Sequence, residues 1–165
     1  MSAGAGPSAT AAAVRPRADG DWPALVDLWV ASWKATFADV DFDARREWLV
    51  QRLRALEAAG AVTLCLFDGA SGAMAGFVTI HPKTGWLDQI CIGPDRFGTG
   101  AASALLAAAR KASPRRIGLD VTADNARAIR FYERQGFREI GEGPRSLSGR
   151  ATVVMEWRAG TKDGR

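Results

Sequence analysis

A glycine turn that opens one helix and a glycine that ends another constrain the fold of this chain more than any other part of its sequence. The turn reads Phe97-Gly98-Thr99-Gly100 and continues into the alanine-rich stretch 101–112. The second signal covers residues 125–137 and reads Asn-x-x-Ala-x-x-Phe-Tyr-x-x-x-Gly-Phe. Glycine reaches positive φ without strain, so it suits both the opening turn and the left-handed helix end. With an apolar strand-like segment at 116–122 between them, these signals indicate an α/β fold.

Hydrophobic periodicity divides the rest of the chain into short strands and two further helices. Asp21 and Asp43 are predicted N-caps, and the glycine-rich segment 68–72 is a predicted hairpin turn. The predicted helices are one that follows Asp21 and carries residues 25–33, and those at 44–59, 101–112 and 125–135. The predicted strands are 13–17, 61–67, 73–81, 86–92, 116–122, 137–141 and 151–157.

Length and composition favour one folded domain, because 165 residues with 24% charged and 47% hydrophobic residues are ordinary globular values. We expect this domain to span residues 13–158, between tails at 1–12 and 159–165. The first tail lacks the basic start and apolar stretch of a signal peptide, and no apolar run reaches the length of about 18 residues that a membrane span needs. Cys65 and Cys91 lie in apolar segments, where buried free thiols fit a reducing cytoplasm.

Charge and metal-ligand content narrow the function classes. The net charge of +4 is modest, the acidic residues are interspersed, and no aromatic–basic motif is present, so the sequence does not favour nucleic acid as a partner. A solvated basic face that attracts a polyphosphate ligand explains the excess of basic over acidic residues better.

One histidine and two separated cysteines make no metal-ligand cluster, so we expect no metal.

The glycine turn has the chemistry of a phosphate site. The first amides of a helix have no partner inside the helix, and the helix dipole adds positive potential there. Gly98 and Gly100 let the backbone approach a ligand without a Cβ in the way. Together with the Asn-to-Phe motif at 125–137, this turn resembles the GNAT family of N-acetyltransferases, over about residues 13–158.

The resemblance implies a fold and a donor substrate. The fold would be α/β (α+β): a central mixed, mostly antiparallel sheet with helices on both faces and two splayed central strands. The donor would be acetyl-CoA, held in the splay by backbone groups near Ile90, Cys91 and Ile92. Its pyrophosphate would lie on the turn formed by Phe97, Gly98, Thr99, Gly100, Ala101 and Ala102. Phe97 departs from the family, which usually has Gln or Arg there.

Tyr132 and Asn125 are the motif residues to which the resemblance gives roles. In the family, the tyrosine at this position protonates the departing thiolate of coenzyme A, and a phenol of pKa ~10 can protonate a thiolate whose conjugate acid has a pKa of ~8.5. The asparagine contacts the cofactor near its pantetheine arm. Tyr132 could instead be a core aromatic, and Asn125 could be a helix N-cap, a role compatible with binding.

The general base is less well determined. Asp88 matches the position at which one branch of the family has a catalytic glutamate, and His81, the only histidine, could act near neutral pH. Both have structural alternatives: Asp88 as an ion-pair partner, His81 at a strand end. A covalent acyl-cysteine on Cys91 is not expected, because an apolar strand does nothing to make its thiol a thiolate.

The sequence therefore predicts an acetyl-CoA-dependent N-acetyltransferase that transfers directly to a primary amine, small molecule or peptide, without choosing among amino acid, polyamine, aminoglycoside and protein N-terminus. Homodimers are common in the family. Two other readings stay open: a non-catalytic acyl-CoA-binding module, and a dinucleotide-binding protein, since Gly98-x-Gly100-x-x-Ser103 nearly fits that fingerprint with Asp120 about twenty residues on. The acceptor site is expected among the aromatic residues Trp29, Trp33, Phe37, Phe42 and Trp48, near the acidic residues Asp39, Asp41 and Asp43.

Overall fold

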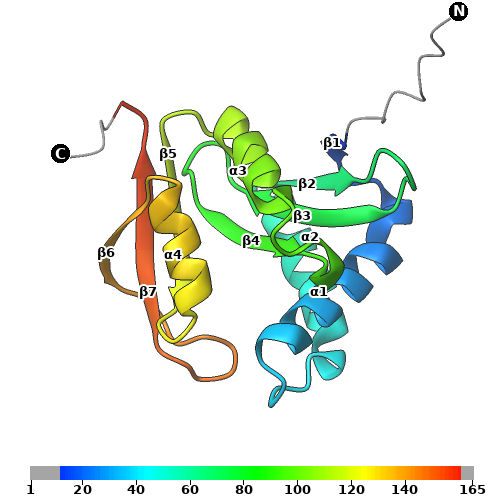
Figure 1. Ribbon diagram of the computed structural model, residues 1–165, viewed down its shortest axis with the longest axis horizontal. Coiled ribbons are helices and arrows are strands. Elements are labelled where there is room, and N and C mark those ends of the chain that lie inside the picture. The colour runs from blue at the N-terminus through cyan, green and yellow to red at the C-terminus, as the bar shows by residue number, and fades with distance from the viewer. Residues whose placement is uncertain (1–11, 161–165) are drawn as a thin grey trace, which may run out of the picture.

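The computed structural model describes residues 12–160, and most of the two predicted tails lies outside this range. It has seven strands and four α-helices in the order that the sequence predicts (Figure 1). Among the described residues, no helix is both long and apolar enough to cross a membrane. The strands are β1 (Ala13–Pro16), β2 (Val62–Phe67), β3 (Met74–Ile80), β4 (Leu87–Ile92), β5 (Arg116–Thr122), β6 (Arg138–Glu142) and β7 (Thr152–Arg158). The helices are α1 (Trp22–Thr36), α2 (Arg46–Ala58), α3 (Ala101–Ala112) and α4 (Ala126–Arg134), with short 3₁₀ turns at Asp19–Asp21, Asp43–Arg45 and Pro94–Arg96.

The two aspartates predicted as N-caps do not cap their helices through their side chains. Asp21 is the N-cap residue of α1, but its carboxylate accepts from Arg15 and from the backbone N–H of Ala18. Asp43 lies in a 3₁₀ turn before α2 and pairs with Lys34 and Arg46. The prediction for Asp21 was therefore right in position, whereas the prediction for Asp43 was wrong, because Arg45 is the N-cap residue of α2. Basic side chains within reach bind both carboxylates more strongly than the first helix amides would.

The strands form two antiparallel sheets, where the sequence predicts one mixed sheet. The first has the order β1-β2-β3-β4 and the second β5-β7-β6. A single parallel bridge, Trp86 to Gly118, joins β4 to β5, and the Gly118 N–H donates to the Gly85 carbonyl at 2.9 Å. This bridge is therefore the one parallel pairing among the described strands, and all the others are antiparallel. These antiparallel sheets also exclude the doubly wound parallel sheet that a dinucleotide fold requires.

A β-bulge lies where the two sheets part. Thr79 pairs with Gln89 and Ile80 pairs with Leu87, so Asp88 is the extra residue on β4. A bulge bends its strand and increases the local twist. Beyond the Trp86–Gly118 bridge, β4 and β5 form no further pairing within the described residues. The bulge thus turns β4 away from β5 and produces the predicted splay.

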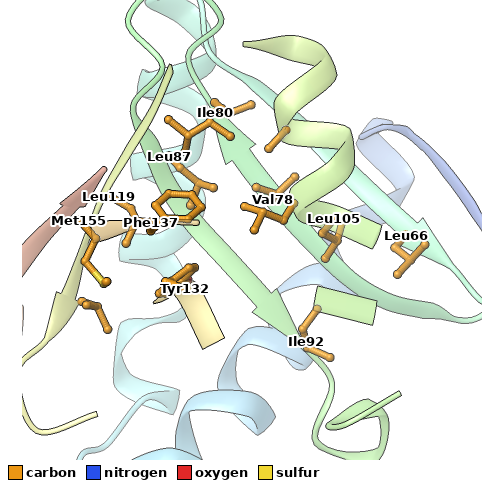
Figure 2. Close-up of a cluster of buried hydrophobic side chains, with 14 of the residues drawn as sticks. Leu66, Val78, Ile80, Leu87, Ile92, Leu105, Leu119, Tyr132, Phe137 and Met155 are labelled. Carbon is orange, nitrogen blue, oxygen red and sulfur yellow. The ribbon is translucent and has the colours of Figure 1, made fainter. Parts of the chain in front are cut away.

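Helices cover both faces of the first sheet, as the family resemblance implies. Alternate side chains of β2, β3 and β4, among them Cys65, Phe77 and Cys91, pack against α1 and α2. The opposite side chains, such as Val78 and Ile80, pack against α3 in a second cluster that continues into β5, β7 and α4 (Figure 2). This second core holds the two sheets together although their strands share only one bridge.

Gly76 on β3 lies where α3 approaches the sheet most closely. A Cβ built on Gly76 would lie 2.6 Å from the Cys91 carbonyl oxygen and 2.9 Å from Cδ1 of Leu105. The position therefore admits only glycine while α3 keeps its present distance from the sheet.

Substituting Gly76→Ala should destabilise the protein by about 1–3 kcal/mol, the usual cost of inserting a methyl group into a packed core. Urea unfolding at constant pH measures the loss. Gly20→Ala is the matched control, because a Cβ there meets nothing within 4 Å. Equal stability of the two variants would contradict the packing described here.

Candidate active site

A cavity of about 1110 Å³ lies in the splay between the two sheets. Its walls include β4 and β5, the N-terminal ends of α3 and α4, and residues from α1, α2 and the β6–β7 loop. In Figure 1, the loop after α1 and the β6–β7 loop lie at the same end of the molecule. The cavity is thus built from segments that are far apart in the sequence.

The backbone of β4 is open towards this cavity at two residues. The Gly93 N–H donates to the Ala75 carbonyl of the neighbouring segment at 2.9 Å. Because alternate residues of an antiparallel ladder bond to the same neighbour, Cys91 also faces β3, while Ile90 and Ile92 face β5. The prediction that the Cys91 backbone would hold a ligand was therefore wrong. The backbone groups of Ile90 and Ile92 point into the gap and remain predicted ligand contacts.

The same alternation opens the facing edge of β5. The Ala123 N–H donates to the Ala151 carbonyl at 2.9 Å, which turns the backbone of Asp120 and Thr122 away from β7. The Thr122 carbonyl accepts from the Asn125 N–H at 2.9 Å, whereas the backbone of Asp120 is left open. Open backbone groups of two strand edges thus face one gap. An extended ligand with amide groups can bind there as an added strand.

The glycine turn forms one end of the cavity. Gly98 and Gly100 have φ of 77° and 87°, and a Cβ on either would meet nothing within 4 Å. The first hydrogen bond of the helix runs from the Ala104 N–H to the Gly100 carbonyl. The amides of residues 101–103 consequently have no partner among the described residues, which is the arrangement that binds phosphate.

Thr99 differs from the rest of the turn. Its hydroxyl donates to the Arg96 carbonyl at 2.6 Å, so its side chain closes the turn, and it does not line the cavity. Phe97, Gly98, Gly100, Ala101 and Ala102 do line it.

Helix α4 presents Tyr132 to the cavity. Asn125 caps the helix by accepting from the Ala128 N–H at 3.3 Å, and it lines the cavity as well. Tyr132 is only 7% exposed, and its hydroxyl forms no hydrogen bond with any described residue. Burial, with the negative charge of Asp120 as a second cause, raises the pKa of Tyr132. The phenol is therefore protonated near neutral pH and free to donate to a ligand.

Comparison with known proteins agrees with this geometry. The model of the Acetyltransferase (GNAT) family matches residues 22–137. The chain belongs to the GNAT family. A sequence comparison with curated proteins gives no match.

Several solved structures share the fold of this GNAT domain. A PaiA N-acetyltransferase from Thermoplasma acidophilum in complex with coenzyme A has a TM-score of 0.71 at 18% identity, covering 90% of this chain and 99% of that one. YjaB from Escherichia coli, in its apo form, has a TM-score of 0.68 at 20% identity, covering 88% and 95%. A GNAT acetyltransferase from Staphylococcus aureus has a TM-score of 0.71 at 14% identity, covering 90% and 99%. At these identities the likeness shows the fold.

Asp88, one predicted base of this GNAT site, lines the cavity but is fully engaged. Arg52 binds it with two hydrogen bonds, Nε to Oδ2 at 2.9 Å and Nη2 to Oδ1 at 2.5 Å. Its side chain is only 6% exposed. Both carboxylate oxygens are thus occupied, so an incoming amine would have to displace Arg52 to reach them. The geometry fits the ion-pair alternative considered for Asp88.

His81, the other predicted base, does not line the cavity. Its Nε2 lies 3.0 Å from the Ala59 carbonyl oxygen, to which it donates, and its Nδ1 accepts from the N–H of Lys83 at 3.2 Å. Both ring nitrogens are therefore used in fixing the turn after β3. The structure does not bring His81 to Tyr132.

Asp120 is a cavity carboxylate for which the sequence suggested no catalytic role. It forms no hydrogen bond or ion pair with any described residue, and it lines the same cavity as Tyr132. Desolvation raises the pKa of Asp120, the charge of Asp88 adds to the shift, and Arg52 opposes it. An acid between Leu119 and Val121, in an otherwise apolar strand, is the signal that could have identified it.

Cys91 is buried between β4 and α1, away from the cavity lining. Burial raises the pKa of its thiol to about 12, although a hydrogen bond with Ser32 acts in the opposite direction. The thiol stays protonated near neutral pH, which agrees with the expectation that it forms no acyl intermediate. Among the described residues, no cluster of potential metal ligands occurs either.

Aromatic side chains from α1 and the loop after it line another part of the cavity. Trp33 stacks on Phe37 and on Phe42, with ring centroids 5.8 Å and 6.0 Å apart. The acidic residues nearby are not free: Arg150 binds Asp39, and Lys34 and Arg46 bind Asp43. Asp41 accepts from the Ala44 N–H. These carboxylates are therefore already engaged, and the aromatic part of the site offers mainly apolar contact.

Substituting Asp120→Asn should raise the melting temperature slightly at pH 7; the gain is small because Asp120 is exposed and solvent screens its charge. A raised pKa means that ionising Asp120 costs more in the native state than in the unfolded chain. This cost appears as the pH rises above the unfolded pKa of ~3.9, and the amide removes it. Asp124→Asn is the control, because Asp124 is half-exposed and paired with Arg150. A gain in melting temperature that persists unchanged at pH ~3, below the unfolded pKa, would contradict the argument.

Proposed function

We propose that this GNAT domain is an acetyl-CoA-dependent N-acetyltransferase that transfers the acetyl group directly to a primary amine. The observation that carries the proposal is the pair formed by Tyr132 and Asp120. A phenol and a carboxylate without protein partners line one cavity, beside two open strand edges and the free amides of α3. Direct transfer needs one group to accept a proton and one to donate a proton at the same place.

The cavity suits both ends of the donor. The free amides at residues 101–103, with the dipole of α3, would hold the pyrophosphate. The open backbone groups of Ile90 and Ile92 would pair with the amides of the pantetheine arm, as in strand addition. An N–H at this edge would also stabilise the oxyanion that forms when an amine attacks the acetyl carbonyl.

The acid and the base have separate tasks. Asp120 accepts a proton from the attacking amine as the new nitrogen–carbon bond forms. Tyr132 donates its proton to the sulfur as the carbon–sulfur bond breaks, and solvent then restores both groups. A free thiol of pKa ~8.5 would be a poor match for a phenol with a raised pKa. However, besides burial, the negative charge of Asp120 contributes to the raised pKa of Tyr132, and this charge is neutralised once Asp120 has accepted the proton of the amine.

Asp120 is a better base than either residue that the sequence indicated. Arg52 occupies both carboxylate oxygens of Asp88, and backbone groups occupy both nitrogens of His81. Asp120 has neither restriction, and its raised pKa brings it closer to the operating pH, which favours proton transfer. Asp88 then acts on Asp120 through its charge.

The acceptor end favours an amine with an apolar body. The stacked rings of Trp33, Phe37 and Phe42 offer apolar contact. Of the acids nearby, Asp39 and Asp43 are paired with basic side chains, and Asp41 accepts from the Ala44 N–H. Polyamines and aminoglycosides need several anionic contacts, which this end of the cavity does not supply. We therefore place monoamines, including amino acids and peptide N-termini, first among the acceptors.

Incubation with acetyl-CoA and a panel of primary amines should release the coenzyme A thiol, followed with a thiol reagent. Tyr132→Phe should lower turnover by about 10²-fold or more, the usual contribution of a positioned acid, while coenzyme A binding measured by calorimetry is retained. Cys91→Ala is the matched control and should keep turnover. Coenzyme A binding without turnover on any amine would support a non-catalytic acyl-CoA-binding module instead.

Substituting Asp120→Asn should lower kcat by about 10²–10⁴-fold and remove the acidic limb of the pH–rate profile. That limb should lie above the usual aspartate range, because the pKa of Asp120 is raised. Asp88→Asn should keep the limb. The assignment fails if Asp88→Asn abolishes the limb and Asp120→Asn leaves it in place.

A further inference from the structure

Phe97 and Arg127 form a cation–π pair at the phosphate end of the cavity. The guanidinium carbon of Arg127 lies 4.6 Å from the centroid of the Phe97 ring. Both residues line the cavity, alongside Gly98 and Gly100. They come from different segments, since Phe97 precedes α3 and Arg127 lies in the first turn of α4. The pair therefore connects the glycine turn to the helix that carries Tyr132.

The glycine turn has no free cation of its own. Arg96, the one basic residue next to it, binds Asp68 and Asp95. The amides of a helix N-terminus offer only about half a positive charge between them. A pyrophosphate carries more negative charge than that, so the turn needs a cation from another segment.

The position of Arg127 is unfavourable for its own helix. A cation in the first turn of a helix is repelled by the helix dipole, and acidic residues are the usual occupants there. Neither α3 nor α4 has an acidic residue in its first turn. Arg127 forms no ion pair or hydrogen bond with any described residue. An anionic ligand between the two helix ends would compensate both dipoles and the arginine together.

The contact with the Phe97 ring leaves the guanidinium of Arg127 able to bind an anion. A carboxylate partner would occupy the N–H groups at the edge of the guanidinium, as Asp88 does for Arg52. An aromatic ring attracts the charge through its π-face and takes no strong hydrogen bond. All five N–H donors of Arg127 thus remain available for phosphate oxygens.

We propose that Phe97 and Arg127 form a clamp for the pyrophosphate of coenzyme A, in which Arg127 binds the phosphate oxygens and Phe97 positions the guanidinium. The inference rests on the proposed function, because it takes coenzyme A as the ligand. The aromatic residue in the glycine turn is then part of the binding site: it holds a cation that the turn itself lacks.

Calorimetric titration of the full chain with coenzyme A and with 3′-dephospho-coenzyme A tests the clamp without an acceptor amine. Arg127→Ala should weaken both ligands about 10–100-fold and by the same factor, since a charge-assisted hydrogen bond contributes about 1.5–3 kcal/mol. Arg130→Ala, on the same helix but away from the cavity lining, should leave both affinities unchanged. Phe97→Leu keeps an apolar side chain without the ring face and should give a smaller loss for both ligands.

Two results would overturn the clamp. One is an unchanged affinity in Arg127→Ala while the wild-type protein binds coenzyme A. The other is a loss confined to coenzyme A, which would place Arg127 at the 3′-phosphate. Because Arg127 is exposed, its variant should fold, and an unchanged melting temperature checks this. If the wild-type protein bound neither ligand, the proposed function itself would be refuted. That result differs from the two that overturn only the clamp.

Discussion

The separation of β4 from β5 is the constraint on which the rest of the site depends. The two sheets meet at the Trp86–Gly118 bridge, where Gly85 has no Cβ to clash with the Arg116 carbonyl, and the bulge at Asp88 then turns β4 away. Each unpaired edge would be costly if it were buried without a partner. In an open gap the same edges become a binding surface, and the cores beside α3 and α4 stabilise the opening without closing it.

Ion pairing divides the cavity into groups that are fixed and groups that are free. Arg52 holds Asp88, and basic residues hold the acids near the aromatic stack. Three groups form no hydrogen bond or ion pair with the described residues, namely Asp120, Tyr132 and Arg127, and these are the groups to which a reaction or a ligand can be assigned. Although Asp120 is exposed, partial desolvation and the neighbouring charge of Asp88 raise its pKa. A raised pKa of this kind is characteristic of a functional position.

Particular residues explain where sequence reasoning was sufficient and where it was not. The turn at Gly98 and Gly100 and the cap at Asn125 follow from local backbone chemistry, so they were predictable. The roles of Asp88 and His81 depend on Arg52 and on the carbonyl of Ala59, which lie 36 and 22 residues away in the chain. Asp120 stands out locally as an acid between Leu119 and Val121, but its lack of an ion-pair partner depends on the tertiary structure.

By itself, the sequence determined the order and type of the elements, the glycine turn before α3 and the position of the tyrosine. These features rest on periodicity and on glycine conformation, which act over a few residues. Only the tertiary structure decided that the strands form two sheets instead of one. It also decided that the backbone of Cys91 faces β3 instead of the gap, and which carboxylate has no ion-pair partner. Those outcomes depend on strand register and on side chains that meet across the fold, and both are set by long-range packing.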